Sequence, residues 1–202
     1  MVARVTVFCG ASYGRGKIFT DAAMRLGKIL GSRGDELIYG GSSTGLMGIL
    51  ADATLAHGGT VTGVIPRGLV EHEIAHPHLT AMEIVESMHE RKARMADKAE
   101  KFIALPGGFG TADELFEIIT WTQLGFQAKP IGLLNIDGYF DPLLKWIVHC
   151  VEMEFVKSQY ADFILVDDEP EALLDRLDTH IPAPPSLFAA GNYVSDSRMD
   201  TR

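Results

Sequence analysis

The feature that most constrains the fold is a regular alternation of short apolar, β-branched runs with longer segments of helical periodicity. The runs predict seven strands, at Arg4–Cys9, Glu36–Tyr39, Thr60–Ile65, Ala81–Val85, Lys101–Leu105, Pro130–Asn135 and Phe163–Val166. Apolar residues recur at helical spacing in the segments 17–32, 44–57, 88–99, 111–124, 142–155 and 169–179. Because such alternation favours a parallel sheet covered by helices, we expect an α/β fold, a Rossmann-like doubly wound parallel sheet of about seven strands flanked by helices.

Length and composition suit a single domain followed by a tail. The chain has 202 residues, 47% of them hydrophobic, which is enough for one core. We place the domain over residues 1–181 and expect 182–202, which are rich in Pro, Ser and Asp, to form a flexible tail. The N-terminus lacks a signal-peptide pattern, and no apolar run reaches membrane-spanning length. The two cysteines, Cys9 and Cys150, are too few for a disulfide scaffold. These observations predict a cytoplasmic protein that does not bind membranes.

The charge balance restricts the partners. Asp and Glu number 27 against 18 Lys and Arg, so the net charge is −9 and a nucleic-acid backbone is a poor partner. Local backbone amides can still bind the phosphate of a small molecule. His72, His76 and His78 lie close together, but in a proline-containing loop without a fourth ligand. We therefore expect neither a metal ion nor a cofactor.

Glycine-rich turns follow three of the predicted strands, at the sheet edge where doubly wound folds bind their ligands. The first turn, 10–16, lacks dinucleotide-binding spacing and is either a plain strand-to-helix turn or, through Ser12, a ligand contact. The second turn, 40–48, has Walker A glycine spacing but Leu46 in place of the lysine, which argues against ATP hydrolysis. Its amides and hydroxyls, with Gly41 and Thr44 among them, suit a monophosphate, although close helix–strand packing would also explain its glycines.

The third turn, Pro106-Gly-Gly-Phe-Gly-Thr111, carries three glycines in four positions. Glycines at this density let the backbone approach a ligand closely and direct several amides towards it. Thr111 and Glu114 also have the spacing of a capping box, which predicts Thr111 as the N-cap of the next helix. A capping box explains those two residues but not the glycines before them. We therefore expect a functional site at this turn.

A cationic cluster, Met88-His-Glu-Arg-Lys92, lies at the start of another predicted helix. Such a run is most often a solvated helix face. Arg91 and Lys92, however, fall in the first turn, where cations oppose the helix dipole, so their position is better explained if they face an anion. Met88 is a candidate for lining a base pocket, although core packing is the more common role of such a residue.

Together, the 88–92 cluster and the 106–114 turn resemble the paired signature of the LONELY GUY family of cytokinin riboside 5′-monophosphate phosphoribohydrolases, many of which were once labelled "possible lysine decarboxylase". The resemblance also takes in residues 8–12 and 39–48, whereas Ala11 and Ser42 depart from the pattern common among relatives. It implies hydrolysis of the N-glycosidic bond of an adenosine 5′-monophosphate to a free adenine-type base and ribose 5-phosphate. It also implies a homodimer, in which the partner can complete the pocket.

The resemblance assigns site residues as well. By motif match, Arg91 and Glu114 are the catalytic pair. The implied substrate contacts are Glu73, Lys92, Gly108, Phe109, Gly110, Thr111 and Thr120, with Gly107 adding an amide to the phosphate site. Cleavage develops positive charge on the ribose, which a carboxylate such as Glu114 stabilises while it orients or deprotonates a water. Arg91 either binds the phosphate or holds Glu114 in place, and the sequence leaves both roles open.

Three alternative functions deserve comparison. The same fold could carry a nucleotide or a molybdenum-cofactor-type ligand without chemistry, although binding alone would not need both Arg91 and Glu114. Lysine decarboxylation requires pyridoxal phosphate on a Schiff-base lysine, and no lysine of the sequence has that context. A hydrolase acting mainly on AMP would differ in its substrate but not in its chemistry.

Overall fold

The computed structural model describes residues 2–70 and 75–180, so Glu73 and the predicted tail lie outside the described residues. All seven predicted strands are present, each within one residue of its expected bounds. They are β1 (Arg4–Phe8), β2 (Glu36–Tyr39), β3 (Thr60–Pro66), β4 (Ala81–Val85), β5 (Lys101–Ala104), β6 (Ile131–Leu134) and β7 (Ile164–Asp167). The central strands are buried on both faces, which is why continuous apolar runs marked them in the sequence.

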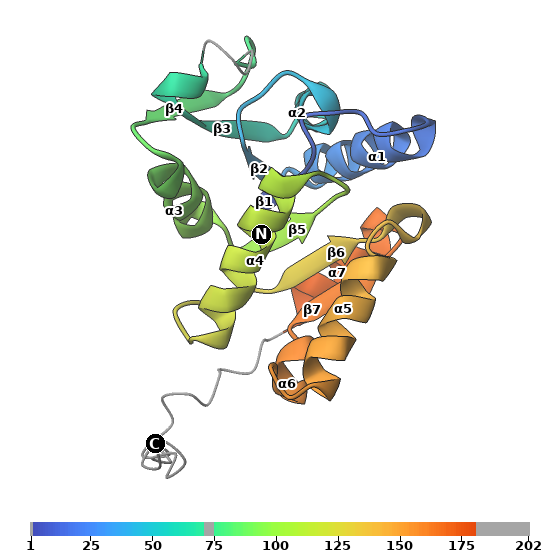
Figure 1. Cartoon of the computed structure of the whole chain (residues 1–202). Helices are drawn as coiled ribbons and strands as arrows, with labels where there is room; N and C mark the ends of the chain where they lie inside the picture. The colour runs from blue at the N-terminus through green and yellow to red at the C-terminus, as the bar shows by residue number, and fades with distance from the viewer. Residues whose placement is uncertain (1, 71–74, 181–202) are drawn as a thin grey trace.

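All strand pairs are parallel, and their order in the sheet is β4-β3-β2-β1-β5-β6-β7 (Figure 1). The chain adds β2, β3 and β4 on one side of β1 and then returns, so that β5 pairs with the other side of β1. The loops that follow β1 and β5 therefore diverge at a topological switch point, which is where such sheets bind ligands. This order confirms the predicted doubly wound sheet.

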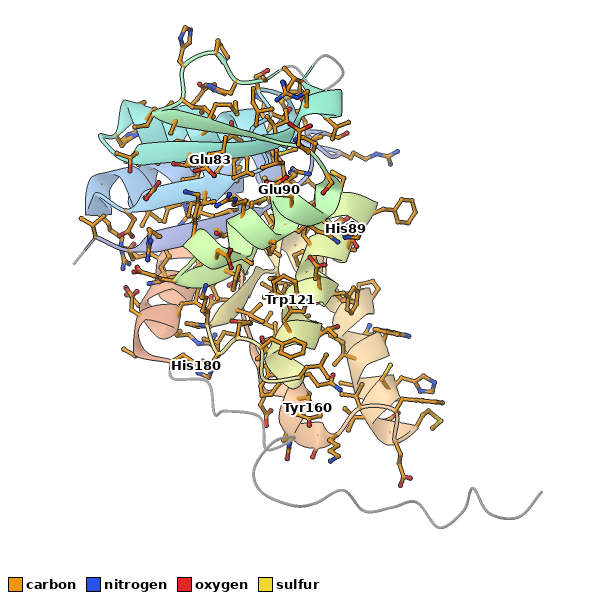
Figure 2. The ribbon with its side chains drawn as sticks, turned by 90° about the vertical axis from the view of Figure 1, so that its left-hand side faces the viewer. Glu83, His89, Glu90, Trp121, Tyr160 and His180 are labelled. Atoms are coloured by element: carbon orange, nitrogen blue, oxygen red, sulfur yellow. The ribbon has the colours of Figure 1, made fainter. Side chains whose placement is uncertain are left out.

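Helices cover both faces of the sheet. On one face, α1 (Lys17–Arg33), α2 (Gly45–Ala56) and α7 (Pro170–Thr179) share a hydrophobic core with the strands. On the other face lie α3 (Met88–Lys98), α4 (Phe109–Gln123) and α5 (Asp141–Glu152), followed by the short α6 (Ser158–Ala161). Figure 2, which labels Glu90 on α3 and Trp121 on α4, shows these two helices side by side. No helix within the described ranges is long and apolar enough to cross a membrane.

The start of α4 differs from the prediction. The helix begins at Phe109 with Gly108 as its N-cap, and the Ala112 amide donates to the Gly108 carbonyl at 3.1 Å. The predicted capping box at Thr111 and Glu114 is therefore wrong. Both side chains are buried instead. Thr111 packs so closely on Gly107 that a Cβ added at Gly107 would lie 2.1 Å from the Thr111 hydroxyl oxygen. Burial of these two side chains outweighs their capping preference.

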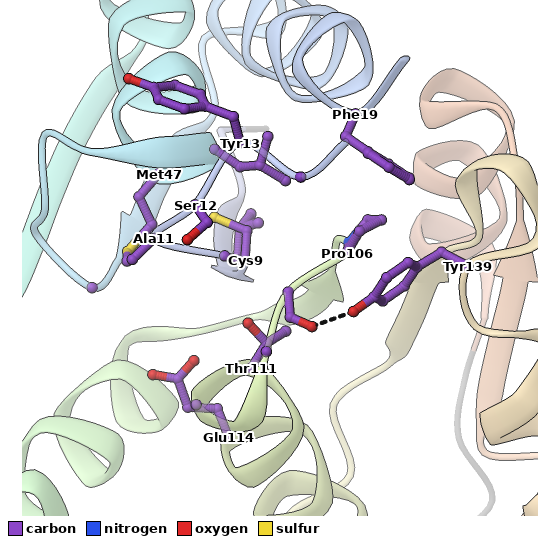
Figure 3. Close-up of a pocket in the computed structure, with 18 of the residues that line it drawn as sticks. Cys9, Ala11, Ser12, Tyr13, Phe19, Met47, Pro106, Thr111, Glu114 and Tyr139 are labelled. Atoms are coloured by element: carbon purple, nitrogen blue, oxygen red, sulfur yellow. Dashed lines mark hydrogen bonds between the residues drawn. The ribbon is translucent and has the colours of Figure 1, made fainter. Parts of the chain in front are cut away.

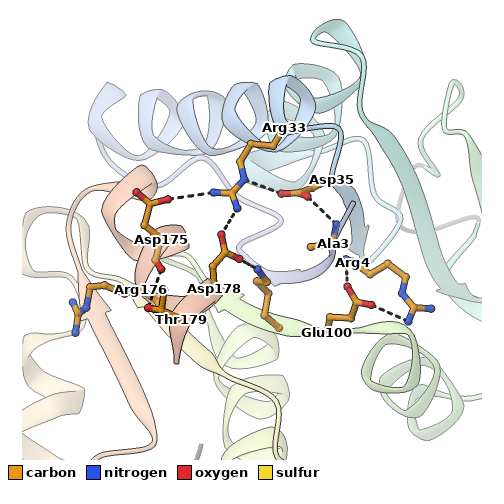
Figure 4. Close-up of polar contacts among 10 residues, drawn as sticks. Ala3, Arg4, Arg33, Asp35, Glu100, Asp175, Arg176, Asp178 and Thr179 are labelled. Atoms are coloured by element: carbon orange, nitrogen blue, oxygen red, sulfur yellow. Dashed lines mark hydrogen bonds and ion pairs between the residues drawn. The ribbon is translucent and has the colours of Figure 1, made fainter. Parts of the chain in front are cut away.

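A network of ion pairs lies at the amino ends of the strands, opposite the switch point (Figure 4). Asp178, near the end of α7, pairs with both Lys101 at the start of β5 and Arg33 at the end of α1. Arg33 also lies 3.2 Å from Asp35, which accepts a hydrogen bond from the Ala3 amide at 2.9 Å. Because Lys101 and Asp35 are buried, these contacts fix the two helices to the strand starts, away from the switch point.

Candidate active site

A cavity of about 500 Å³ opens at the switch point between β1 and β5. Figure 3 shows Cys9 and Ser12 on one side of it, with Thr111 and Glu114 on the other. Much of its wall is backbone, because the glycine-rich turns after three strands all reach it. The predicted residues that line it are Ser12, Arg91, Gly107, Gly108, Gly110, Thr111 and Glu114.

The turn after β5 brings the N-terminus of α4 to this cavity. In an α-helix the first four N–H groups have no acceptor within the helix, and in α4 they belong to Gly108, Phe109, Gly110 and Thr111. Gly108, Gly110 and Thr111 line the cavity. A Cβ added at Gly108 or Gly110 would meet no other part of the described chain within 4 Å, apart from its chain neighbours and the backbone of its own helix, so packing among the described residues does not explain either glycine. Their absent side chains leave room for a group to approach the N-terminus of α4, where the helix dipole favours a negative charge.

Arg91 and Glu114 form a buried pair at the cavity wall. Arg91 Nη1 lies 3.6 Å from Glu114 Oε1, and both side chains are less than a tenth exposed. The guanidinium also donates from Nε to the Val64 carbonyl at 3.1 Å and from Nη2 to the Gly40 carbonyl at 3.4 Å. A Cβ at Gly40 would lie 2.0 Å from Nη2, so only glycine allows this approach. The backbone thus fixes Arg91 with one edge of its guanidinium towards Glu114.

Cys9 reaches the same cavity, where its surroundings favour the protonated thiol. Burial, and after it the charge of Glu114, raises the pKa of the Cys9 thiol well above its ordinary value, although Arg91 opposes the shift. Only the thiolate is a strong nucleophile, so a thiol held protonated gives no covalent catalysis. Glu114 is the carboxylate among the described residues of this wall, so it fits charge stabilisation or proton transfer.

Several predicted contacts lie away from the cavity wall. Lys92 binds Asp113 at 3.0 Å and Glu117 at 3.2 Å, so the anions that Arg91 and Lys92 face are carboxylates of α4. Burial alone would lower the pKa of Lys92, but its hydrogen bonds with these two carboxylates outweigh it and raise that pKa.

The other predicted contacts outside the wall are Met88, Phe109, Thr120, Gly41 and Thr44. Met88, Phe109 and Thr120 have exposed side chains on α3 and α4. Thr44 is the N-cap of α2, with its hydroxyl 2.9 Å from that of Ser42, and the Gly41 carbonyl accepts from the His76 amide. Both residues therefore shape the loop next to Gly40 rather than the cavity itself. Glu73 lies outside the described residues.

An aromatic wall escaped the sequence analysis. Tyr13, Phe19 and Tyr139 all line the cavity, and the rings of Phe19 and Tyr139 meet edge to face at 5.9 Å. Tyr139 follows β6, the neighbour of β5, so the rule that ligands bind beyond the carboxyl ends of the strands pointed to its loop. No glycine-rich motif marks that loop, however, so no local sequence signal distinguishes Tyr139.

The fold and this cavity define a Rossmann-like protein with a buried arginine–carboxylate pair beside the N-terminus of a helix. A family model described as "Possible lysine decarboxylase" matches residues 47–177. The chain is 46% identical over 179 residues to the probable cytokinin riboside 5′-monophosphate phosphoribohydrolase LOGL2 of Oryza sativa subsp. japonica, covering 89% of this chain and 73% of the relative. It is 44% identical to the cytokinin riboside 5′-monophosphate phosphoribohydrolase LOG1 of Arabidopsis thaliana, covering 89% and 84%. The chain therefore belongs to the LONELY GUY family.

Solved structures share the fold at lower identity. The molybdenum-cofactor carrier protein of Chlamydomonas reinhardtii superposes with a TM-score of 0.67 at 20% identity, over 88% of this chain and 98% of that one. The molybdenum cofactor binding protein of Rippkaea orientalis gives 0.68 at 18% identity, over 88% and 96%. These likenesses extend to the fold alone.

Proposed function

We propose that this protein hydrolyses the N-glycosidic bond of cytokinin riboside 5′-monophosphates, or of AMP, to release the adenine-type base and ribose 5-phosphate. The observation that carries the proposal is the buried Arg91–Glu114 pair in one cavity with the open amides at the start of α4. Relatives at 44–46% identity that carry this activity in their names support it.

The N-terminus of α4 is the proposed phosphate site. The amides of Gly108, Gly110 and Thr111 donate to the phosphate oxygens, and the helix dipole adds a favourable field. Gly108 and Gly110 leave the space that the phosphate needs. This site requires no cation beside the phosphate, which agrees with the engagement of Lys92 by Asp113 and Glu117.

Glu114 is the proposed catalytic carboxylate, and Arg91 is the residue that holds it. As the bond between C1′ and N9 breaks, its electron pair goes to the base and positive charge develops on the ribose, where Glu114 stabilises it. A water oxygen bonds to C1′, Glu114 takes a proton from that water, and solvent protonates the departing base. Arg91 is bound to the carbonyls of Gly40 and Val64, so it orients Glu114 rather than moving to the phosphate.

We further propose a cytoplasmic homodimer that associates through α5 and the adjacent face of α4. No residue of α5 is fully buried, although the helix carries many apolar side chains. Trp146 is 53% exposed and Phe155, just beyond the helix, is 85% exposed. Exposed apolar surface of this extent is typical of an association surface. Phe116 of α4 meets Trp146 edge to face and so extends this surface towards the site.

Product analysis tests the proposed reaction. The protein is incubated with AMP and with isopentenyladenosine 5′-monophosphate, without added metal, and the free base and ribose 5-phosphate are quantified. Equal amounts of the two products support the proposal, and the ratio of kcat/KM values identifies the preferred base. Release of phosphate or of a nucleoside, without free base, would contradict it.

A further inference from the structure

We infer that Tyr139 is a positioning residue that holds the Gly107–Gly108 peptide in the orientation that binds phosphate. The inference rests on the proposed function, because it assigns a role within the proposed phosphate site. The Tyr139 hydroxyl donates to the Gly107 carbonyl oxygen, as the dashed line in Figure 3 shows. Tyr139 also lines the cavity itself.

The geometry of a peptide bond gives this hydrogen bond its consequence. A trans peptide is planar, so the Gly107 carbonyl and the Gly108 N–H point in opposite directions. With the carbonyl held towards Tyr139, the Gly108 N–H is turned away from Tyr139. Rotation of this peptide by half a turn would replace that donor with a carbonyl oxygen, which repels an anion.

The Gly108 side of this peptide offers little resistance to such a rotation, whereas Gly107 packs closely against Thr111. Both residues around the peptide are glycines, which have no Cβ to restrict the backbone dihedral angles. Apart from its chain neighbours, no atom of residues 2–70 and 75–180 would lie within 4 Å of a Cβ at Gly108, so these residues leave open space around it. A hydrogen bond from outside the turn therefore favours one orientation, and Tyr139 supplies it.

Hydrogen bonds within the loop after β6 hold Tyr139 in this position. The Asn135 side chain accepts from the Phe140 amide at 2.7 Å and donates to Asp141 at 2.8 Å, which closes the loop. Asp137 adopts a left-handed backbone conformation, with φ of 53°, that is uncommon for a residue other than glycine. Such strain persists where surrounding contacts enforce it, and it is frequent near functional sites.

The rings of Phe19 and Phe140 meet Tyr139 edge to face, at 5.9 and 5.1 Å. These contacts alone would keep an aromatic ring in place without any need for the hydroxyl. The substitution Tyr139→Phe separates the two roles, because it retains the ring and removes only the donor.

Binding measurements test the inference independently of turnover. The affinities of the wild type and Tyr139→Phe for ribose 5-phosphate and for adenosine are measured by calorimetry, beside kcat/KM for AMP. We expect the affinity for ribose 5-phosphate and kcat/KM for AMP to fall about tenfold, the worth of one hydrogen bond to a ligand-binding turn, and the affinity for adenosine to stay unchanged. Tyr160→Phe, which removes a buried hydroxyl outside the cavity, is the control and should change none of these values.

Unchanged ribose 5-phosphate affinity in Tyr139→Phe would overturn the inference. Equal weakening of ribose 5-phosphate and adenosine would overturn it too, because that pattern indicates general damage to the cavity. A wild type that releases no base overturns the proposed reaction alone, since the comparison of affinities does not depend on turnover.

Discussion

Arg91 Nη1 lies 3.6 Å from Glu114 Oε1, although the two residues belong to α3 and α4 and their helices approach the cavity from different strands. The remaining nitrogens of Arg91 bind the carbonyls of Gly40 and Val64. A guanidinium fixed in this way cannot swing towards a phosphate without breaking buried hydrogen bonds. The geometry thus favours one of the two roles that the sequence left open for Arg91.

Arg91→Lys separates these roles. Lysine keeps the charge but cannot hold Glu114 and two carbonyls at once, because it lacks the planar fork of the guanidinium. We expect kcat for AMP to fall roughly hundredfold or more and the affinity for ribose 5-phosphate to remain unchanged. Steady-state kinetics and calorimetry on the same preparation measure both. A loss confined to ribose 5-phosphate affinity, with kcat preserved, would assign Arg91 to the phosphate.

Gly110→Ala tests the space at the start of α4. Outside its own helix, no atom of the described part of the chain lies within 4 Å of the added methyl group, and alanine is favoured over glycine in a helix, so stability should rise by about 0.5–1 kcal/mol. The methyl group would occupy space proposed for the phosphate, so kcat/KM for AMP should fall roughly 10- to 100-fold. Thermal unfolding and kinetics measure the two effects.

Gly68→Ala is the matched control for this substitution. Among the residues that the structure describes, Gly68 is equally free of neighbours within 4 Å, and it lies outside the cavity wall. Its replacement should leave kcat/KM unchanged. Full activity in Gly110→Ala would show that the phosphate does not approach this part of the turn.

The exposed face of α5 is tested by Trp146→Glu. A charge in the centre of an apolar association surface is strongly unfavourable, so light scattering should show a monomer where the wild type is a dimer. Met24→Glu on α1 is the control, because Met24 is 52% exposed against 53% for Trp146 but lies on the other side of the sheet. A wild type that is monomeric at working concentration would contradict the proposed dimer.

The strands could be predicted to within one residue because buried parallel strands have continuous apolar sequences. The start of α4 could not, because the capping preference of Thr111 is a local signal and its burial against Gly107 is a tertiary one. The four-residue α6 is too short to show a period.

The glycines and cations in the sequence located the site, but the sequence did not predict which groups their side chains contact. Sequence spacing placed Lys92 beside Arg91, yet only the packing of α3 on α4 brings it to Asp113 and Glu117. Tyr139 carries no motif, and it reaches Gly107 only because β6 lies beside β5.

Asp178 makes stability depend on pH. Burial alone would raise the pKa of Asp178, but its hydrogen bonds with Lys101 and Arg33 outweigh burial and hold that pKa below its ordinary value. A carboxyl whose pKa is depressed by folding stabilises the fold above its unfolded pKa of about 3.9, and this contribution is lost as the pH falls through the folded pKa.

Asp178→Asn should therefore lower Tm at pH 6 and converge with the wild type at the acid end of a pH series. The expected loss at pH 6 is about 1–3 kcal/mol, because Lys101 is left buried without its carboxylate. Activity at that pH should be unchanged, since the network lies at the edge of the sheet away from the cavity. A Tm difference that stays constant with pH would contradict this assignment.

The most direct test of the central claim compares binding with turnover in Glu114→Gln. Glutamine keeps the size of the side chain but cannot stabilise positive charge or accept the proton of water. We predict that wild type and variant bind AMP with similar affinity. The variant should release base and ribose 5-phosphate more slowly than the wild type, by a factor of roughly one hundred or more. A wild type that binds AMP without releasing base, or a variant that keeps full activity, would contradict the claim that this cavity cleaves the glycosidic bond through Glu114.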